Sequence, residues 1–326
     1  MFPIYRARRI RQDGIREILD DSLVEVKKLM LPIFVMPGSD KVEEICSMPG
    51  VYRYTTDKVL AFVEDAVKSG IKSIIFFGIS DVKDPIGSWA SNSEGEVQKA
   101  IRLVKKEFPE MTVAADTCLC EYTDHGHCGI VREGEILNDE TLEVLNEVAI
   151  SYAESGADII APSGMMDGMV MSIRDALDSK GFYNTIIMSY SVKYSSCFYG
   201  PFRDAAESAP KFGNRKTHQM SPYFGYNEAV KESLIDVDEC ADILMVKPGL
   251  AYLDVLKTVK EKVLLPVAVY NVSGEYSMVK AAGINGWIDE MSTISEIFYA
   301  FTRAGADIII SYHSLDYAKW LAGSNK

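Results

Sequence analysis

Three segments of the chain resemble one another, and this repetition constrains the fold more than any other feature of the sequence. They read SGADIIAPSG at 155–164, ECADILMVKPG at 239–249 and AGADIIISYH at 304–313. Each passes from a helix end through Ala-Asp into a short apolar run, and then into polar residues or Gly and Pro. Such self-similarity indicates a repeated βα unit. A chain of such units is expected to bury its strands in a parallel sheet covered by helices.

The same pattern elsewhere raises the number of strand candidates to eight. The other five lie at 31–38, 71–80, 111–119, 184–193 and 265–274. Segments with helical spacing separate most of them, at 57–69, 95–107, 139–154, 227–239 and 251–262. Eight such units in about 300 residues predict an α/β fold of the (β/α)8 TIM-barrel type. A doubly wound open sheet is the alternative, but no Gly-x-Gly-x-x-Gly motif follows any strand.

Two regions fall outside this pattern. Residues 194–224 are rich in Gly, Pro, Ser and Arg, and we expect them to form a lid over an active site. Residues 1–25 are expected to form an extended N-terminal arm in front of a catalytic barrel at 26–326. The arm combines basic with apolar side chains: Arg6, Arg8, Arg9, Arg11 and Arg16 with Tyr5, Ile10 and Ile15. It either lies on an acidic neighbouring subunit, which opposite potentials favour, or is a solvated tail.

The charge and composition exclude several classes of protein. With 34 basic and 47 acidic residues the net charge is −13, which argues against a nucleic-acid partner. No run approaches the roughly 18 apolar residues of a membrane span. The start, MFPIYRARRIRQDG, has no apolar core, so we expect no secretory signal. Six cysteines without an export signal then indicate reduced thiols and a cytoplasmic location.

Two lysines lie at the ends of neighbouring strands. Lys193 ends the strand at 184–193, and Lys247 follows the apolar run at 243–246. A single lysine there could simply extend its amine to the surface. Two together repel each other, and repulsion with burial lowers at least one pKa, which gives a neutral amine near pH 7. This predicts a Schiff base with a carbonyl substrate, with Asp116 or Ser163 holding the amine and moving its proton.

The segment DTCLCEYTDHGHC, residues 116–128, is the second candidate site. Cys118, Cys120 and Cys128 stand on one strand-end loop, and three thiolates bind zinc well while leaving an open position. His125 or His127 could replace one of them as a ligand. The alternative is that all three are reduced core cysteines. The metal is favoured because a loop with Gly126 and Gly129 is a poor place to bury thiols. The remaining cysteines are expected in the core: Cys46, Cys197 and Cys240.

Other polar residues suit a substrate carboxylate. The lid carries Arg203, Arg215 and Lys216, and guanidinium groups bind carboxylates in bidentate fashion. A solvated basic loop is the alternative. Ser273 and Tyr312 end the last two strands, where hydroxyls without a glycine-rich loop suit a carboxylate better than a phosphate.

Five segments of the sequence together resemble one known family. They are DTCLCEYTDHGHCG, APSGMMDG, SYSVKYSSCFYGPFRDAA, MVKPGLAYLD and VSGEYSMVKAA. From about residue 6 to residue 320 the chain resembles porphobilinogen synthase, also called 5-aminolevulinate dehydratase. The resemblance implies a (β/α)8 barrel whose N-terminal arm wraps a neighbour, in a homo-oligomer that is usually an octamer. It also implies a lyase of tetrapyrrole (haem) biosynthesis that condenses two 5-aminolevulinate molecules into porphobilinogen, with loss of two waters.

The same resemblance implies roles for individual residues. Lys247 would bind the substrate that becomes the propionate side, and Lys193 the substrate of the acetate side. Ser273 and Tyr312 would hold the carboxylate of the first. Arg203 and Arg215, with Lys216 nearby, would hold that of the second.

The resemblance also implies metal ions. Cys118, Cys120 and Cys128 would bind a catalytic Zn²⁺, as in the zinc-dependent branch of the family. Glu232, in the EAVKES helix, would bind an activating Mg²⁺. An exposed helical glutamate with no ligand is the alternative for this last residue.

Two other functions compete with this one. A class I aldolase acting on a sugar phosphate would use one Schiff base, but it needs a phosphate site and has no use for three cysteines. A barrel that stores or senses metal through the cysteine loop would bind metal without amine reactivity at Lys247.

Overall fold

Eight parallel strands form a closed barrel in the computed structural model, which describes residues 7–19 and 24–324. The strands are β1 (Leu29–Met36), β4 (Ser73–Gly78), β5 (Thr112–Thr117), β8 (Ile159–Pro162), β9 (Ile186–Lys193), β10 (Ile243–Lys247), β11 (Val267–Asn271) and β12 (Ile308–Ser311). Pairing of β12 with β1 closes the ring, so the predicted barrel is confirmed and the open sheet is wrong. All eight predicted strands are present.

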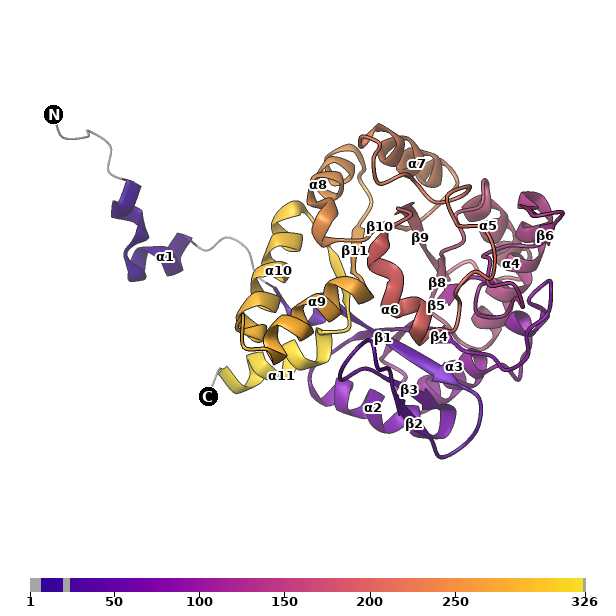
Figure 1. The fold of residues 1–326 in the computed structure, drawn as a ribbon, viewed down its shortest axis with the longest axis horizontal. Coiled ribbons are helices and arrows are strands. Elements are labelled where there is room, and N and C mark those ends of the chain that lie inside the picture. The colour runs from indigo at the N-terminus through magenta and orange to yellow at the C-terminus, as the bar shows by residue number, and fades with distance from the viewer. Residues whose placement is uncertain (1–6, 20–23, 325–326) are drawn as a thin grey trace.

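Helices follow the strands and surround the barrel, as Figure 1 shows. They are α2 (Thr56–Lys68), α3 (Glu96–Glu107), α4 (Asn138–Glu154), α5 (Met169–Ser179), α7 (Asn227–Asp238), α8 (Leu253–Lys262), α9 (Ser273–Ile284), α10 (Glu290–Ala304) and α11 (Ser314–Ser324). Helix α8 begins later than predicted, because the 3-10 turn η5 (Leu250–Tyr252) precedes it. Within the described ranges, no helix combines the length and the apolar character needed to cross a membrane.

Two apolar layers form the core, one on each side of the strands. Side chains alternate between them because successive residues of a strand point to opposite faces. On β10, Leu244 and Val246 pack outward against the helices, whereas Met245 packs inside the barrel. The inner layer also contains Tyr190 of β9 and Tyr270 of β11. The inside of the barrel is therefore filled rather than hollow.

Short elements cover the ends of this barrel. Strand β3 (Tyr52–Thr55) runs parallel to β1 and pairs with the antiparallel β2 (Val42–Glu44). Strands β6 (Val131–Arg132) and β7 (Glu135–Ile136) form a hairpin after the cysteine loop. The predicted lid contains the 3-10 turn η4 (Cys197–Tyr199) and α6 (Gly200–Ala205). Figure 1 draws α6 in the middle of the ring, where Phe202 packs on Phe77 with ring centroids 5.2 Å apart.

The N-terminal region contains η1 (Ala7–Arg11) and α1 (Asp13–Leu19), and η2 (Val26–Lys28) leads into β1. In Figure 1, η1 and α1 stand apart from the barrel. Ile10, Ile15 and Ile18 are exposed there, so these helices present apolar surface. Tyr5 and Arg6 of the predicted arm lie outside the described residues. The boundary at residue 25 and the contact with a neighbour stay predictions.

Candidate active site

An irregularity between β9 and β10 brings the two lysines together. Leu244 pairs with Ser189, but Val246 pairs with Val192, so β9 has one extra residue at this point. The extra residue reverses the alternation on β9, and Lys193 turns inward although Ile187 and Val192 pack outward. Lys193 then pairs directly with Lys247. Both side chains line one cavity, and each residue is 5% exposed.

Aromatic rings surround the amine of Lys247. Its Nζ lies 4.4 Å from the ring centroid of Tyr270, 4.9 Å from Tyr190, 5.1 Å from Phe202 and 5.3 Å from Tyr199. Burial among these rings, with repulsion from Lys193, lowers the pKa of Lys247 to about 7. Lys247 is therefore neutral at pH 7 much more often than an ordinary lysine, and a nucleophile requires the neutral amine. The predicted lowering of at least one lysine pKa is confirmed.

Polar groups surround the amine of Lys193. Its Nζ donates to the carbonyl oxygen of Ser163 at 2.5 Å. The hydroxyl of Ser163 in turn donates to Oδ2 of Asp116 at 3.1 Å. Burial raises the pKa of Asp116, although both lysines act to lower it. A carboxyl group next to two amines, with Oδ1 lacking a hydrogen-bond partner among the described residues, can accept and return a proton.

The three cysteines after β5 form one buried cluster. The Sγ atoms of Cys118, Cys120 and Cys128 lie within 4.8 Å of one another, and those of Cys118 and Cys120 are 3.3 Å apart. Thiol hydrogen bonds from Cys118 and Cys120, assisted by the charge of Arg215, hold the pKa of Cys128 well below its ordinary value. Over the described ranges, no other group of His, Cys, Asp or Glu side chains comes this close. This donor set fits Zn²⁺.

Two expectations about cysteine burial were wrong. The loop does bury its thiols, because β5 and the lid segment enclose it. The other three cysteines are exposed rather than in the core: Cys46 lies between β2 and β3, Cys197 begins η4, and Cys240 lies between α7 and β10.

Neither histidine considered as a replacement ligand joins the thiol cluster. His127 places Nε2 3.0 Å from the carbonyl oxygen of Phe212. The Nδ1 atom of His125 accepts a hydrogen bond from the backbone N–H of His127.

Two arginines of the lid face the same cavity as the lysines. Arg215 is buried and donates to the carbonyl oxygens of Gly126 and Ser208, at 2.9 and 2.6 Å. Arg203 is half-buried, and burial together with Arg215 lowers its pKa. The Nε atoms of both are buried and lack a hydrogen-bond partner among the described residues. Two guanidinium groups at one cavity, neither of them ion-paired with a carboxylate within the described residues, are suited to a substrate carboxylate.

The lid closes tightly over this cavity, whose volume is about 20 Å³. Ser273 accepts a hydrogen bond from the backbone N–H of Phe202 and donates to the carbonyl oxygen of Phe198. A Cβ at Gly274 would meet that oxygen at 2.5 Å, so glycine permits this close approach. Neither Ser273 nor Tyr312 lines the cavity itself; Tyr312 lies in the inner layer of the barrel, with its Oη 2.9 Å from that of Tyr270. With α6 in this position, the cavity is too small to hold a substrate molecule.

Two further predicted residues also lie outside this cavity. Lys216 and Glu232 line a neighbouring cleft of about 780 Å³. Partial burial raises the pKa of Glu232 to about 7, and Asp236 and Asp167 contribute to the increase. This accumulation of carboxylates suits a cation, although the structure does not bring Lys216 to the lysine pair.

Several site residues were not predicted from the sequence. Four are the rings around Lys247, which come from three separate parts of the chain. Strand alternation places Tyr190 and Tyr270 inside the barrel and could have indicated them. Glu121 lines the cavity beside Cys120, and His218 contributes to lowering the Cys128 pKa. No local signal distinguishes these last two.

Comparisons with known proteins agree with this geometry. Residues 4–320 match the family model of delta-aminolevulinic acid dehydratase. The chain is 54% identical to the Bacillus subtilis protein of that name over 97% of this chain and 98% of the relative. It is 53% identical to the Synechococcus elongatus protein of that name, over 99% and 100%. It is also similar to a Toxoplasma gondii porphobilinogen synthase solved with porphobilinogen, with a TM-score of 0.97 and 42% identity, covering 100% of this chain and 95% of that one.

Proposed function

This chain belongs to the delta-aminolevulinic acid dehydratase family, and on that premise we propose which of its residues carry out the reaction. The enzyme is a porphobilinogen synthase, a hydro-lyase of haem biosynthesis. It condenses two molecules of 5-aminolevulinate into porphobilinogen with loss of two waters. The aldolase and metal-storage alternatives are therefore set aside.

Lys247 and Lys193 each bind one substrate as an imine in this proposal. Lys247 takes the substrate of the propionate side, and Lys193 that of the acetate side. The direct pairing of the two lysines on adjacent strands is the observation that carries the proposal. Each amine adds to a ketone carbon and expels one water, and two imines held side by side make the later bond-forming steps intramolecular. Both lysines are released when the pyrrole forms.

Asp116 and Ser163 move protons for these steps. Each addition requires the amine to lose a proton and the carbinolamine oxygen to gain one. Asp116 is the carboxyl group that we assign to these proton transfers. It interacts electrostatically with both lysines, and its Oδ2 accepts a hydrogen bond from Ser163. The Ser163 carbonyl keeps the Lys193 amine in place.

The carboxylates of the two substrates are assigned to different groups. Ser273 and Tyr312 bind the carboxylate of the Lys247 substrate once α6 has moved. Arg203 and Arg215, with Lys216 at the neighbouring cleft, bind that of the Lys193 substrate. The unpartnered Nε atoms of both arginines support this assignment within the described part of the chain.

Two metal ions complete the proposal. Cys118, Cys120 and Cys128 hold Zn²⁺, which polarises a substrate oxygen on the Lys193 side when it is bound. Glu232 is a ligand of an activating Mg²⁺, supported by the acidic groups that raise its pKa. The enzyme is proposed to be a cytoplasmic homo-octamer in which the arm at residues 1–25 contacts a neighbouring subunit. The exposed apolar side chains of α1 support that contact.

Borohydride trapping tests the lysine assignment. Protein loaded with Zn²⁺ is incubated with 5-aminolevulinate, reduced and digested, and the modified lysines are identified by mass spectrometry. Adducts with the mass of the substrate less one oxygen, as a reduced imine leaves, are expected on Lys247 and Lys193, and not on the exposed Lys257. Absence of an adduct on both site lysines would contradict the imine mechanism.

A further inference from the structure

A buried carboxylate outside the predicted site connects three strands of the barrel. Glu275, in the first turn of α9, is 0% exposed. Its Oε1 accepts a hydrogen bond from the backbone N–H of Leu250 at 2.7 Å. Its Oε2 accepts from the backbone N–H of Val272 and from Nδ2 of Asn271, both at 3.0 Å. All three partners are donors, so they match two accepting carboxylate oxygens and not an amide, and these bonds oppose the burial that raises the pKa of Glu275 to about 7.

Each partner of Glu275 lies close in sequence to a residue of the substrate site. Leu250 follows Lys247 by three residues, and Val272 directly precedes Ser273. Asn271 continues the network, because its Oδ1 accepts from the hydroxyl of Ser311 at 2.9 Å. Ser311 directly precedes Tyr312. The carboxylate therefore joins the ends of β10, β11 and β12.

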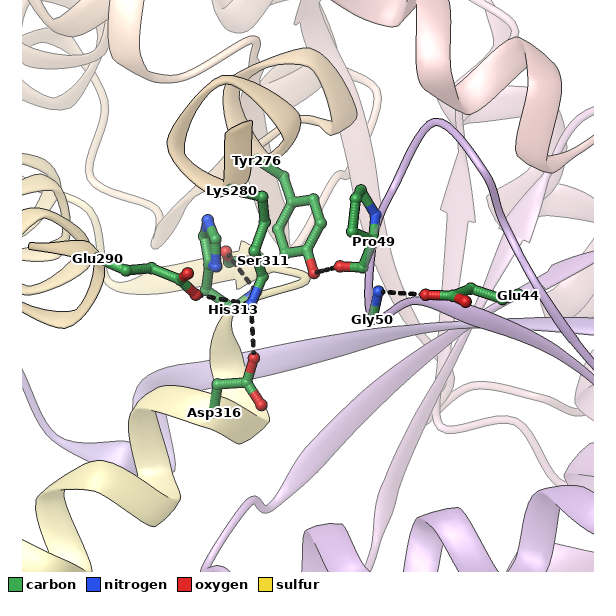
Figure 2. Close-up of polar contacts among 9 residues, drawn as sticks. All are labelled: Glu44, Pro49, Gly50, Tyr276, Lys280, Glu290, Ser311, His313 and Asp316. Carbon is green, nitrogen blue, oxygen red and sulfur yellow. Dashed lines mark hydrogen bonds and ion pairs between the residues drawn. The ribbon is translucent and has the colours of Figure 1, made fainter. Parts of the chain in front are cut away.

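The rest of α9 is fixed by a second set of contacts, shown in Figure 2. Tyr276 donates from Oη to the carbonyl oxygen of Pro49 at 2.6 Å. Lys280 forms ion pairs with Glu290 and Asp316, at 2.6 and 3.3 Å. The ring of His313, at the end of β12, packs on Tyr276 with centroids 4.3 Å apart. These contacts hold the helix in one position, so its first turn can hold the strand ends in theirs.

We propose that Glu275 is a positioning residue that sets the places of Lys247, Ser273 and Tyr312 relative to one another. The inference rests on the proposed roles of those three residues. A fully buried carboxylate is costly, and here the cost is offset because it accepts from three donors that an apolar side chain would leave unpaired. Its use here is explained by what it fixes, namely one amine and two hydroxyls that must meet the same substrate. Among the described residues, the side chains of Glu275, Asn271 and Ser311 form no hydrogen bond with the Lys193 side, built on β5, β8 and β9, although Lys193 itself pairs with Lys247.

The variant Glu275→Gln tests this proposal, because its amide places a donor against a donor at one of the two oxygens. Trapping is carried out over a range of 5-aminolevulinate concentrations. We expect the concentration for half-maximal modification of Lys247 to rise about tenfold or more, with that of Lys193 unchanged. An unchanged value for Lys247, or an equal rise at both lysines, would overturn the proposal.

Two further variants separate positioning from stability. Glu290→Gln breaks the ion pair with Lys280 of the same helix and controls for loss of stability. We expect it to lower the melting temperature without changing either half-maximal concentration. Ser311→Ala keeps all bonds of Glu275 but cuts its link to β12, and we expect a rise of about threefold for Lys247 alone.

These experiments also distinguish the proposal from its premise. If wild-type protein forms no adduct on either lysine, the assigned lysine roles fail, and the role of Glu275 fails with them. If wild-type protein forms both adducts and Glu275→Gln behaves identically, only the role of Glu275 fails. If Glu275→Gln does not fold, Ser311→Ala decides, and an unchanged half-maximal concentration for Lys247 then overturns the proposal.

Discussion

Lys247 and Lys193 pair across adjacent strands and are equally buried, yet their surroundings differ. Lys247 lies among four aromatic rings, and its pKa falls to about 7. Lys193 donates to a carbonyl oxygen, beside a serine and a carboxyl group. Strand pairing therefore brings two identical amines together, while the neighbouring side chains make them chemically different. This difference predicts that the Lys247 amine reacts readily with a ketone. The Lys193 amine is instead expected to react with proton transfer through the neighbouring Ser163 and Asp116.

The largest effects are expected from removing the amines. Lys247→Met and Lys193→Met should each lower kcat by about 10³-fold or more, because the product needs two imines at once. Trapping should separate the two variants. We expect Lys193→Met still to form the adduct on Lys247, since the aromatic surroundings of that amine remain. Loss of the Lys247 adduct in Lys193→Met would show that the two amines react only as a pair.

A smaller loss of activity is expected when one of the proposed metal ligands is removed. Cys128→Ala should lower activity about 10²-fold and abolish stoichiometric zinc binding, measured by metal analysis. The adduct on Lys247 should persist, because none of its four surrounding rings belongs to the cysteine loop. Cys240→Ala, at an exposed thiol, is the matched control and should retain both zinc and activity. Full zinc content in Cys128→Ala would contradict the assignment.

The sequence was sufficient for the barrel, for placing the two lysines at one edge of the sheet and for the cysteine cluster, because each depends on a local pattern. Apolar runs with helical segments between them define βα units wherever they occur. Two lysines at the ends of consecutive strands of a parallel sheet must lie at one edge. Three cysteines within one short loop can meet without help from the rest of the chain.

Features that depend on register or on distant segments could not be predicted. The extra residue in β9 turns Lys193 inward, but alternation from Ile187 alone would turn it outward. The rings around Lys247 come from β9, β11 and the lid, so no single window contains them. Exposure of Cys46, Cys197 and Cys240 depends on where connections run over the surface.

The pH dependence of imine formation provides a sharper test of the difference between the lysines. Only the neutral amine adds to a ketone, so the rate at Lys247 should rise as pH increases to about 7 and level off above it. Below that value we expect a fall of about tenfold per pH unit. A 4-oxo acid without the substrate amine is the suitable probe, since it adds no titrating amine of its own. A midpoint near the ordinary lysine value of 10.5 would contradict the role of burial.

The smallest effect is expected from Tyr270→Phe, which separates the ring from its hydroxyl. The ring that lies 4.4 Å from the Lys247 amine remains, so the midpoint of the pH dependence should not move. The hydroxyl of Tyr312 loses its partner, so the 4-oxo acid concentration for half-maximal trapping at Lys247 should rise about threefold. Tyr252→Phe, which removes a phenol outside the barrel, should change neither value. A lower rate with a shifted midpoint in Tyr270→Phe would mean that the hydroxyl, and not the apolar ring, controls the Lys247 amine. In that case both lysines would be controlled by polar neighbours, and the apolar surroundings of Lys247 would not explain how the two amines differ.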